Sequence, residues 1–178
     1  MNTDPANGRL EHRADTPVLR FERNFAHPTE RVWAALTEAD ELDHWFPTTI
    51  SGSRRPGAEL RFEFRPPMEH DGFDGELITF DPPRLFALTW GPSELWFGLE
   101  PTDAGCELQF SPSLDTIGVA ARTAAGWHVC LDLLVAHVAG EDTQAPTDEP
   151  TPAWQAHYDH YRAEFGDAAA SAPSEHVD

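Results

Sequence analysis

The feature that most constrains this fold is one helical pattern, which runs from Asp115 to Gly140. Its apolar residues recur every three or four positions and share one face of a helix. They are Ile117, Ala120, Ala124, Trp127, Leu131, Leu134 and Val138. At about 1.5 Å per residue such a helix is ~35 Å long, enough to cross a small domain. The half before Trp127 carries small side chains, so it either lets another backbone approach closely or leaves space beneath itself. We interpret the pattern as the second case, a helix that closes a cavity above a β-sheet.

Most of the remaining domain has the period of β-strands. A strand over 17–25 comes first, and further strands are predicted over 48–53, 58–65, 73–80, 84–90, 94–100 and 106–111. Turn residues separate them roughly every eight to twelve residues, which favours one curved antiparallel sheet with an apolar face and a solvated face. Two short helices that contain tryptophan, one beginning near Pro28 and one over 39–45, follow the first strand. The predicted class is therefore α+β, with a curved sheet wrapped around a long C-terminal helix.

Composition divides the chain into three parts. Residues 1–16 are polar and poor in large apolar groups, so we expect a disordered N-terminal arm. Residues 17–140 form the predicted domain. Residues 141–178 are acidic and combine a linker that contains prolines with a short amphipathic helix from Pro152 to Gly166. The apolar side of this helix is expected to dock on the domain.

Charge argues against several classes of partner, and the cysteines bear on where the protein is located. The chain has 31 acidic residues against 12 basic ones, all arginine, and a formal charge of −19. Nucleic acids and anionic membrane surfaces are therefore not expected as partners. We also expect no membrane insertion, because we find no apolar run long enough to span a bilayer. The chain does not begin with the apolar core of a signal peptide, and Cys106 and Cys130 are interpreted as buried free thiols, so we predict a cytoplasmic location.

Several strings in the sequence resemble one protein family. They are HPTERVWAALTEADELDHWF, RRPGAELRF, DGELITFDPPRLFALTW, ELWFGLEP, CELQF and AAGWHVCLDLLVAHV, all between residues 18 and 140. The chain is similar to the homologues of the activator of heat-shock-protein-90 ATPase, within the START-like (SRPBCC) superfamily. The resemblance implies a helix-grip fold with a cavity between helix and sheet. It defines no ligand, because members include presumed lipid or polyketide binders and co-chaperone-like proteins, and it brings no shared catalytic motif.

Aromatic residues from separate predicted elements point into the interior beneath the long helix. This group contains Trp45, Phe46, Phe62, Phe64, Trp90, Phe97 and Trp127, together with Leu134. These side chains either fill the core or line a cavity. We favour a cavity, because aromatic walls that face a helix of small residues pack poorly without something between them. The predicted function is binding of a hydrophobic or aromatic small molecule, held mainly by burial of apolar area at roughly 25 cal/mol per Å².

Two other functions stay open at this stage. The first is a cyclase- or hydrolase-like enzyme in the same cavity, with His128 as the ionisable group and Asp132, one helical turn later, to orient its imidazole. The same two residues also fit an ordinary pair on a helix surface. The second is a chaperone-associated regulator or a homodimer, with Trp96 as a contact on the outer face of the sheet. Catalysis is the less expected outcome, and we assign no catalytic residue.

Metal and nucleophile sites have less support in the sequence. His157 and His160 lie three residues apart beside Asp159, and His70 lies in a loop, but neither place has a third ligand at a recognisable spacing. We find no serine elbow and no phosphate-binding loop in the sequence. Cys130 has no cationic neighbour that would activate its thiol. We therefore predict no metal, no cofactor and no covalent catalysis.

Overall fold

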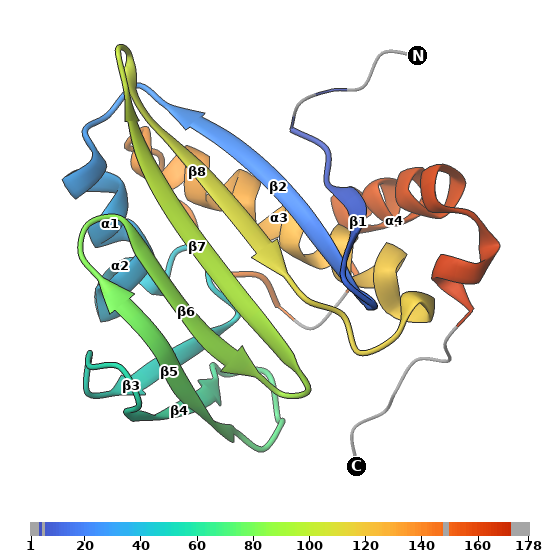
Figure 1. Ribbon diagram of the computed structural model, residues 1–178, viewed down its shortest axis with the longest axis horizontal. Helices are drawn as coiled ribbons and strands as arrows, with labels where there is room; N and C mark the ends of the chain where they lie inside the picture. Colours follow the sequence, from blue (N-terminus) through green and yellow to red (C-terminus); the bar gives the residue numbers. More distant parts are fainter. Residues whose placement is uncertain (1–3, 5, 148–149, 172–178) are drawn as a thin grey trace.

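An eight-stranded antiparallel sheet curls around one long helix in this protein (Figure 1). The structure, a computed structural model, describes residues 4, 6–147 and 150–171. The strands are β1 Arg9–Arg13, β2 Thr16–Phe25, β3 Thr48–Gly52, β4 Glu59–Phe64, β5 Phe73–Asp81, β6 Leu85–Trp90, β7 Ser93–Thr102 and β8 Gly105–Pro112. Their order in the sheet is β1-β2-β8-β7-β6-β5-β4-β3. The strands from β3 to β8 therefore form a meander, and β2 lies beside β8.

Two groups of helices complete the fold. Their elements are α1 Thr29–Thr37, α2 Ala39–Leu42, the 3-10 turn η1 Ile117–Val119, α3 Ala120–Val138, α4 Pro152–Phe165 and the 3-10 turn η2 Asp167–Ala170. In Figure 1, α1 and α2 lie on one side of the view and α4 and β1 on the other, with α3 behind β2 and β8. This arrangement confirms the predicted α+β fold, with a curved sheet, a long helix after it and two short helices before the meander.

Alternation along the strands produces the core between the sheet and α3. In β8, buried residues alternate with half-buried ones. Phe97 of β7 stacks on Phe110 of β8, with ring centroids 4.5 Å apart. On α3 the side chains of Trp127, Leu131 and Leu134 are buried. The apolar faces of sheet and helix therefore meet in one core.

The N-terminal segment differs from the prediction of a disordered arm over 1–16. Arg9–Arg13 form β1, which pairs with the first half of β2, from Arg9 opposite Arg20 to Arg13 opposite Thr16. All residues of β1 except Leu10 are exposed, as expected for an edge strand. The polar composition that suggested disorder is therefore that of an edge strand. Residues 1–3 and 5 of the arm lie outside the described residues.

The small residues of α3 also have a role other than the predicted one. The fully buried alanines are Ala120, Ala121, Ala124 and Ala125. α3 packs on the sheet on one side and on α4 with η2 on the other. A Cβ placed on Gly126 would lie 4.0 Å from the indole nitrogen of Trp154 on α4. The small residues therefore let a second helix pack closely, which is the interpretation that we did not favour from the sequence.

The reason given for expecting no membrane insertion is wrong, and the expectation itself stays a prediction. By length and composition alone, Ile117–Val138 could cross a bilayer, although we found no such run in the sequence. Core helices often meet the same criteria, and here the segment packs between the sheet and α4.

Candidate functional site

The aromatic residues predicted to line a cavity come together in one cluster beneath α3. Trp127 contacts the rings of Phe46 and Trp90, and both pairs of centroids are 5.7 Å apart. Trp90 also contacts Phe62, with centroids 5.1 Å apart. The sequence pattern therefore identified side chains that meet in space, although they come from helix α3, two strands and the segment after α2.

These rings pack on one another between α3 and the sheet. The buried members of the predicted set are Trp45, Phe46, Phe62, Phe97, Trp127 and Leu134. Trp45 is fixed by its indole N–H, which donates to the carbonyl oxygen of Ala35 at 2.8 Å. Trp90 and Phe64 are half-buried, and Phe64 contacts Phe73 at the edge of the cluster. The predicted lining is therefore part of the packed core, and its contact with a ligand stays a prediction.

A small cavity lies beside this cluster, between the two short helices and the sheet. Its volume is about 10 Å³, close to the minimum that holds one water molecule. The lining residues are Leu36, Thr37, Leu42, Ile50, Arg54, Leu60, Leu77, Phe80, Phe86 and Leu88. None of the residues predicted from the sequence to bind a ligand is among them. The cavity thus lies under α1 and α2, nearer the β3 edge of the sheet.

A bulge in β5 explains part of the difference between the ligand-binding residues predicted from the sequence and the residues that line the cavity. Leu77 pairs with Leu88 and Phe80 pairs with Phe86, so β5 has one residue more than β6 between these pairs. The extra residue turns Phe80 to the same face as Leu77, although the two are three positions apart. Both side chains then line the cavity. Simple alternation along the sequence assigns them to opposite faces.

Arg54 is the one charged residue in this lining. Its Nη2 donates to the carbonyl oxygens of Thr37 and Ile50, each at 3.3 Å. Burial lowers the pKa of Arg54, and no carboxylate of the described residues opposes this shift. Within the described part of the chain, the guanidinium therefore lies at an apolar cavity with backbone oxygens as its hydrogen-bond acceptors.

A second, polar cluster joins α3 to α4. Asp132 Oδ2 lies 3.6 Å from His128 Nε2, one turn earlier on α3, and 3.5 Å from His157 Nε2 on α4. The rings of His128 and His157 stack, with centroids 3.7 Å apart and 18° between their planes. The possible metal-ligating atoms of the three residues all lie within 4.8 Å of one another. The structure therefore adds a third residue to groups that were incomplete in the sequence.

Tyr161 and Arg23 surround the polar cluster. The hydroxyl of Tyr161 lies 2.7 Å from His128 Nδ1 and accepts a hydrogen bond from the backbone N–H of Gly8 at 2.7 Å. Arg23 Nη2 lies 3.7 Å from Oδ1 of Asp132, the carboxylate oxygen that is not near the imidazoles. This buried nitrogen has no hydrogen-bond partner among the described residues. The cluster thus links the N-terminal segment, β2, α3 and α4.

Burial shifts the pKa values of the polar cluster. Burial, with His157 and Arg23 nearby, lowers the pKa of His128 to about 3. Burial also raises the pKa of Tyr161 to about 12. Both groups are therefore neutral at neutral pH. A general base works best when its pKa is near the working pH, so these surroundings do not favour the acid–base role considered for His128.

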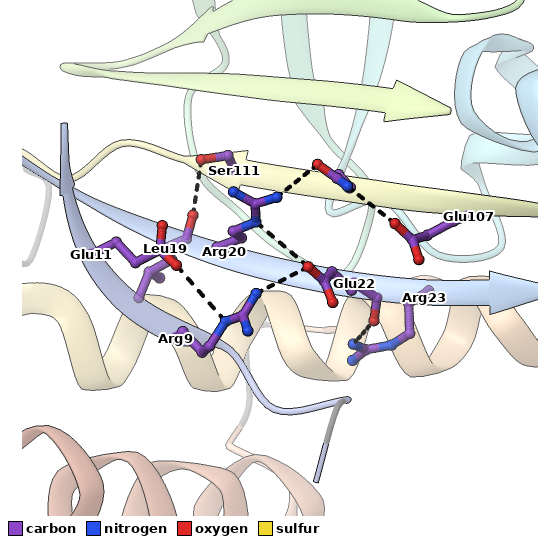
Figure 2. A network of polar contacts seen from close by, with 9 residues as sticks. Arg9, Glu11, Leu19, Arg20, Glu22, Arg23, Glu107 and Ser111 are labelled. Atoms are coloured by element: carbon purple, nitrogen blue, oxygen red, sulfur yellow. Dashed lines mark hydrogen bonds and ion pairs between the residues drawn. The ribbon is translucent and has the colours of Figure 1, made fainter. Parts of the chain in front are cut away.

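The outer face of β2 and β8 carries a network of arginines and acidic residues (Figure 2). Arg20 Nη2 donates to Gln109 Oε1 at 2.9 Å, and Arg9 Nη2 donates to Glu22 Oε1 at 3.0 Å. A hollow of about 210 Å³ lies beside it and is lined by Glu11, His12, Arg13, Val18, Arg20, Gln109, Phe110 and Ser111. Arg20 has Gln109 and Glu22 as side-chain partners, and Arg13, which also lines the hollow, is exposed.

The other residues singled out in the sequence lie apart from these sites. Trp96 is half-buried on the outer face, where its indole N–H donates to Glu94 Oε2 at 2.8 Å, and its role in a dimer stays a prediction. His160 is exposed and contacts the ring of Tyr161, so it does not join His157. Cys106 and Cys130 are buried and free, as expected. Burial raises the pKa of Cys130 to about 12, which makes its thiol a poor nucleophile.

Comparison with known proteins identifies one family. The model of the family described as Activator of Hsp90 ATPase homolog 1-like protein (AHSA1) matches residues 26–139. This range includes both short helices, β3 to β8 and α3, whereas β1, α4 and His157 lie outside it. A search of curated proteins found no match.

Several solved structures share the fold. EF2215, a conserved protein of unknown function from Enterococcus faecalis, has a TM-score of 0.71 and 20% identity, over 89% of this chain and 90% of that chain. CalU16 from Micromonospora echinospora has a TM-score of 0.68 and 21% identity, over 89% and 94% of the two chains. The protein encoded by gene BPP1335 from Bordetella parapertussis has a TM-score of 0.63 and 27% identity, over 93% and 94%. These similarities extend well beyond the range of the family model.

Proposed function

Because the chain belongs to the family of Activator of Hsp90 ATPase homolog 1-like proteins, we propose that it binds a hydrophobic or aromatic small molecule that carries an anionic group. The binding space is the cavity under α1 and α2, enlarged when these helices move away from the sheet. The observation that carries the proposal is the lining, in which apolar side chains surround one arginine whose hydrogen-bond acceptors, among the described residues, are two backbone carbonyls.

The surroundings of Arg54 favour an anion. A partly buried cation loses hydration, and an acidic partner offsets that loss better than a neutral one. The two hydrogen bonds of Arg54 are 3.3 Å long, at the weak end for N–H···O contacts. Arg65, by contrast, has an acidic partner, Asp43, at 2.8 Å. A ligand carboxylate can accept two parallel hydrogen bonds from a guanidinium, which supplies the partner that Arg54 lacks.

The rest of the lining favours an apolar body for the ligand. Leucine, isoleucine and phenylalanine side chains make up most of the surface, so a hydrocarbon or an aromatic ring gains free energy by leaving water. A volume of about 10 Å³ is too small for such a group, and the lining must therefore open. We assign this movement to α2, a helix of 4 residues, and opening then requires that the hydrogen bonds of Glu41 to His137 and Arg31 break.

A pair of related probes tests both parts of this proposal. Decanoate and decanol have the same chain, and only the first is anionic at neutral pH. Titration followed by tryptophan fluorescence should show that the wild-type protein binds decanoate more tightly than decanol. Arg54→Gln should weaken decanoate binding by about tenfold or more and leave decanol binding unchanged, because a charge-assisted hydrogen bond is lost. Arg55→Gln is the matched control, since Arg55 is exposed and does not line the cavity.

Two results would contradict the proposal. If neither probe binds and native mass spectrometry of freshly purified protein shows no bound compound, the cavity has no ligand of this class. If both arginine variants weaken decanoate binding equally, the effect arises from the overall charge of the protein, and Arg54 does not contact the anion.

A further inference from the structure

We propose that His128, Asp132 and His157 bind a zinc ion that joins α3 to α4. Two imidazole nitrogens and one carboxylate oxygen are common ligands of Zn²⁺, and a water molecule completes the tetrahedron. All three side chains can supply atoms within 4.8 Å of one another. The site does not depend on the proposed ligand cavity, which lies under α1 and α2.

The distances fit a group gathered around an ion. At metal–ligand bonds of about 2.0–2.1 Å, tetrahedral ligand atoms lie about 3.3 Å apart. Asp132 Oδ2 lies 3.6 Å from His128 Nε2 and 3.5 Å from His157 Nε2. Both distances exceed the range of about 2.7–3.2 Å that is usual for N–H···O hydrogen bonds. The three groups are therefore close to one another without pairing well directly.

The orientation of the rings requires one small movement. A shared ion must lie in the plane of both imidazoles, whereas the rings of His128 and His157 stack with 18° between their planes. His157 is the ring that can turn, because its side chain is 24% exposed while that of His128 is 7% exposed. A rotation of His157 brings its lone pair toward Asp132 without a change in the backbone of α3.

Neighbouring residues hold the other two ligands in place. A histidine that binds a metal through Nε2 usually donates its Nδ1–H to a nearby acceptor, and the hydroxyl of Tyr161 lies 2.7 Å from His128 Nδ1. Arg23 Nη2 is 3.7 Å from Oδ1 of Asp132 and leaves Oδ2 for the ion. The charge of Arg23 opposes zinc, while the chain's formal charge of −19 favours a cation. The half-exposed Asp132 gives water access to the fourth position.

Zinc titration of the full chain tests the site. Protein treated with EDTA and then dialysed should bind one zinc ion per chain in a calorimeter. Its Tm should rise by about 5 °C when zinc is in hundredfold excess over the dissociation constant. His157→Gln should weaken zinc binding by about tenfold or more, and His160→Gln, an exposed position one turn later on α4, should leave it unchanged.

Cobalt absorption reports directly on the residues that bind the metal, and substitutions that only affect the stability of the fold would not change it. Co²⁺ in the wild-type protein and in His160→Gln should give the visible absorption of a tetrahedral site. His157→Gln and Asp132→Asn should lose this absorption while circular dichroism shows that both are folded. Equal zinc affinity of the wild type and His157→Gln would overturn the proposal. The absence of one-to-one zinc binding to the wild type would also overturn it.

Discussion

Glu41 Oε2 accepts a hydrogen bond from His137 Nε2 at 2.6 Å, and this contact joins α2 to the last turn of α3. The same oxygen accepts a hydrogen bond from Arg31 Nη1 of α1 at 3.0 Å. His137 also stacks on His44, with ring centroids 4.2 Å apart. One carboxylate thus connects three helices, next to Leu42, which lines the small cavity.

Glu41→Gln should destabilise the fold by about 1–2 kcal/mol at pH 7, because two charge-assisted hydrogen bonds lose their acceptor charge. Burial raises the pKa of Glu41, but hydrogen bonds from His137 and Arg31 outweigh it, so the pKa lies below its ordinary value of 4.5. A carboxyl with a lower pKa in the folded state stabilises the fold above pH 4.5 and loses this contribution as the pH falls through the folded value. Urea unfolding should therefore show a smaller difference between wild type and variant at pH 4 than at pH 7.

Asp40→Asn is the control for this measurement. Asp40 lies on the same short helix and is exposed, so the change removes one negative charge without a buried contact. Its effect at pH 7 should stay within about 0.5 kcal/mol. Equal effects of the two substitutions would show that the contact between Glu41 and His137 does not stabilise α2.

Tyr161→Phe should cost about 1–3 kcal/mol in protein kept in EDTA. The hydroxyl of Tyr161 accepts from Gly8 N–H and lies 2.7 Å from His128 Nδ1, so its removal leaves two buried groups without this partner. Tyr158→Phe is the matched control, because Tyr158 lies on the same helix and stacks on Trp154 through its ring. Thermal unfolding should show a lower Tm for the first variant only. Identical Tm values would mean that water replaces the hydroxyl at little cost.

Gly105→Ala should destabilise the protein by about 3 kcal/mol or more, through both backbone strain and overlap. Gly105 has φ +152°, and a Cβ would lie 2.0 Å from the carbonyl oxygen of Phe25 and 2.7 Å from the nitrogen of His27. Gly57 has φ +82° but no atom within 4 Å of the added Cβ. Gly57→Ala should therefore cost only about 1 kcal/mol, which is the strain alone. Urea unfolding of both variants separates the backbone strain from the steric overlap. Similar losses in the free energy of unfolding would contradict the overlap at Gly105.

The sequence predicted the fold because periodicity encodes which face of an element is buried. Leu60 and Phe62 alternate with charged residues in β4, and both are buried as this pattern requires. The polarity of β1 gave the opposite impression, since an edge strand with exposed side chains has the composition of a disordered segment. Periodicity therefore predicts a strand where one of its faces is buried, and it does not predict a strand where both faces are exposed.

The candidate sites were less predictable than the fold for three physical reasons. Parity shows that Trp127 and Phe46 face the interior, but the closeness of their packing depends on side-chain volumes and on the curvature of the sheet. The bulge between Leu77 and Phe80 leaves no clear sign in the sequence. The polar cluster depends on how α4 docks on α3, and no local pattern relates His157 to His128. The spacing of His128 and Asp132 indicates a metal site only when His157 is known to lie beside them.

Neither cysteine should react with 5,5′-dithiobis(2-nitrobenzoic acid) in the native protein at pH 8. Burial raises the pKa of Cys130 to about 12, so only about one thiol in ten thousand is ionised at that pH. Burial also raises the pKa of Cys106, and both side chains are inaccessible in the core. Both thiols should react in guanidinium chloride. The absorbance of the released thiolate, measured with and without denaturant, gives the number of reactive thiols per chain. Rapid labelling of Cys130 in the native chain would show that α3 separates from the sheet in solution, because Cys130 is reached only when this core opens.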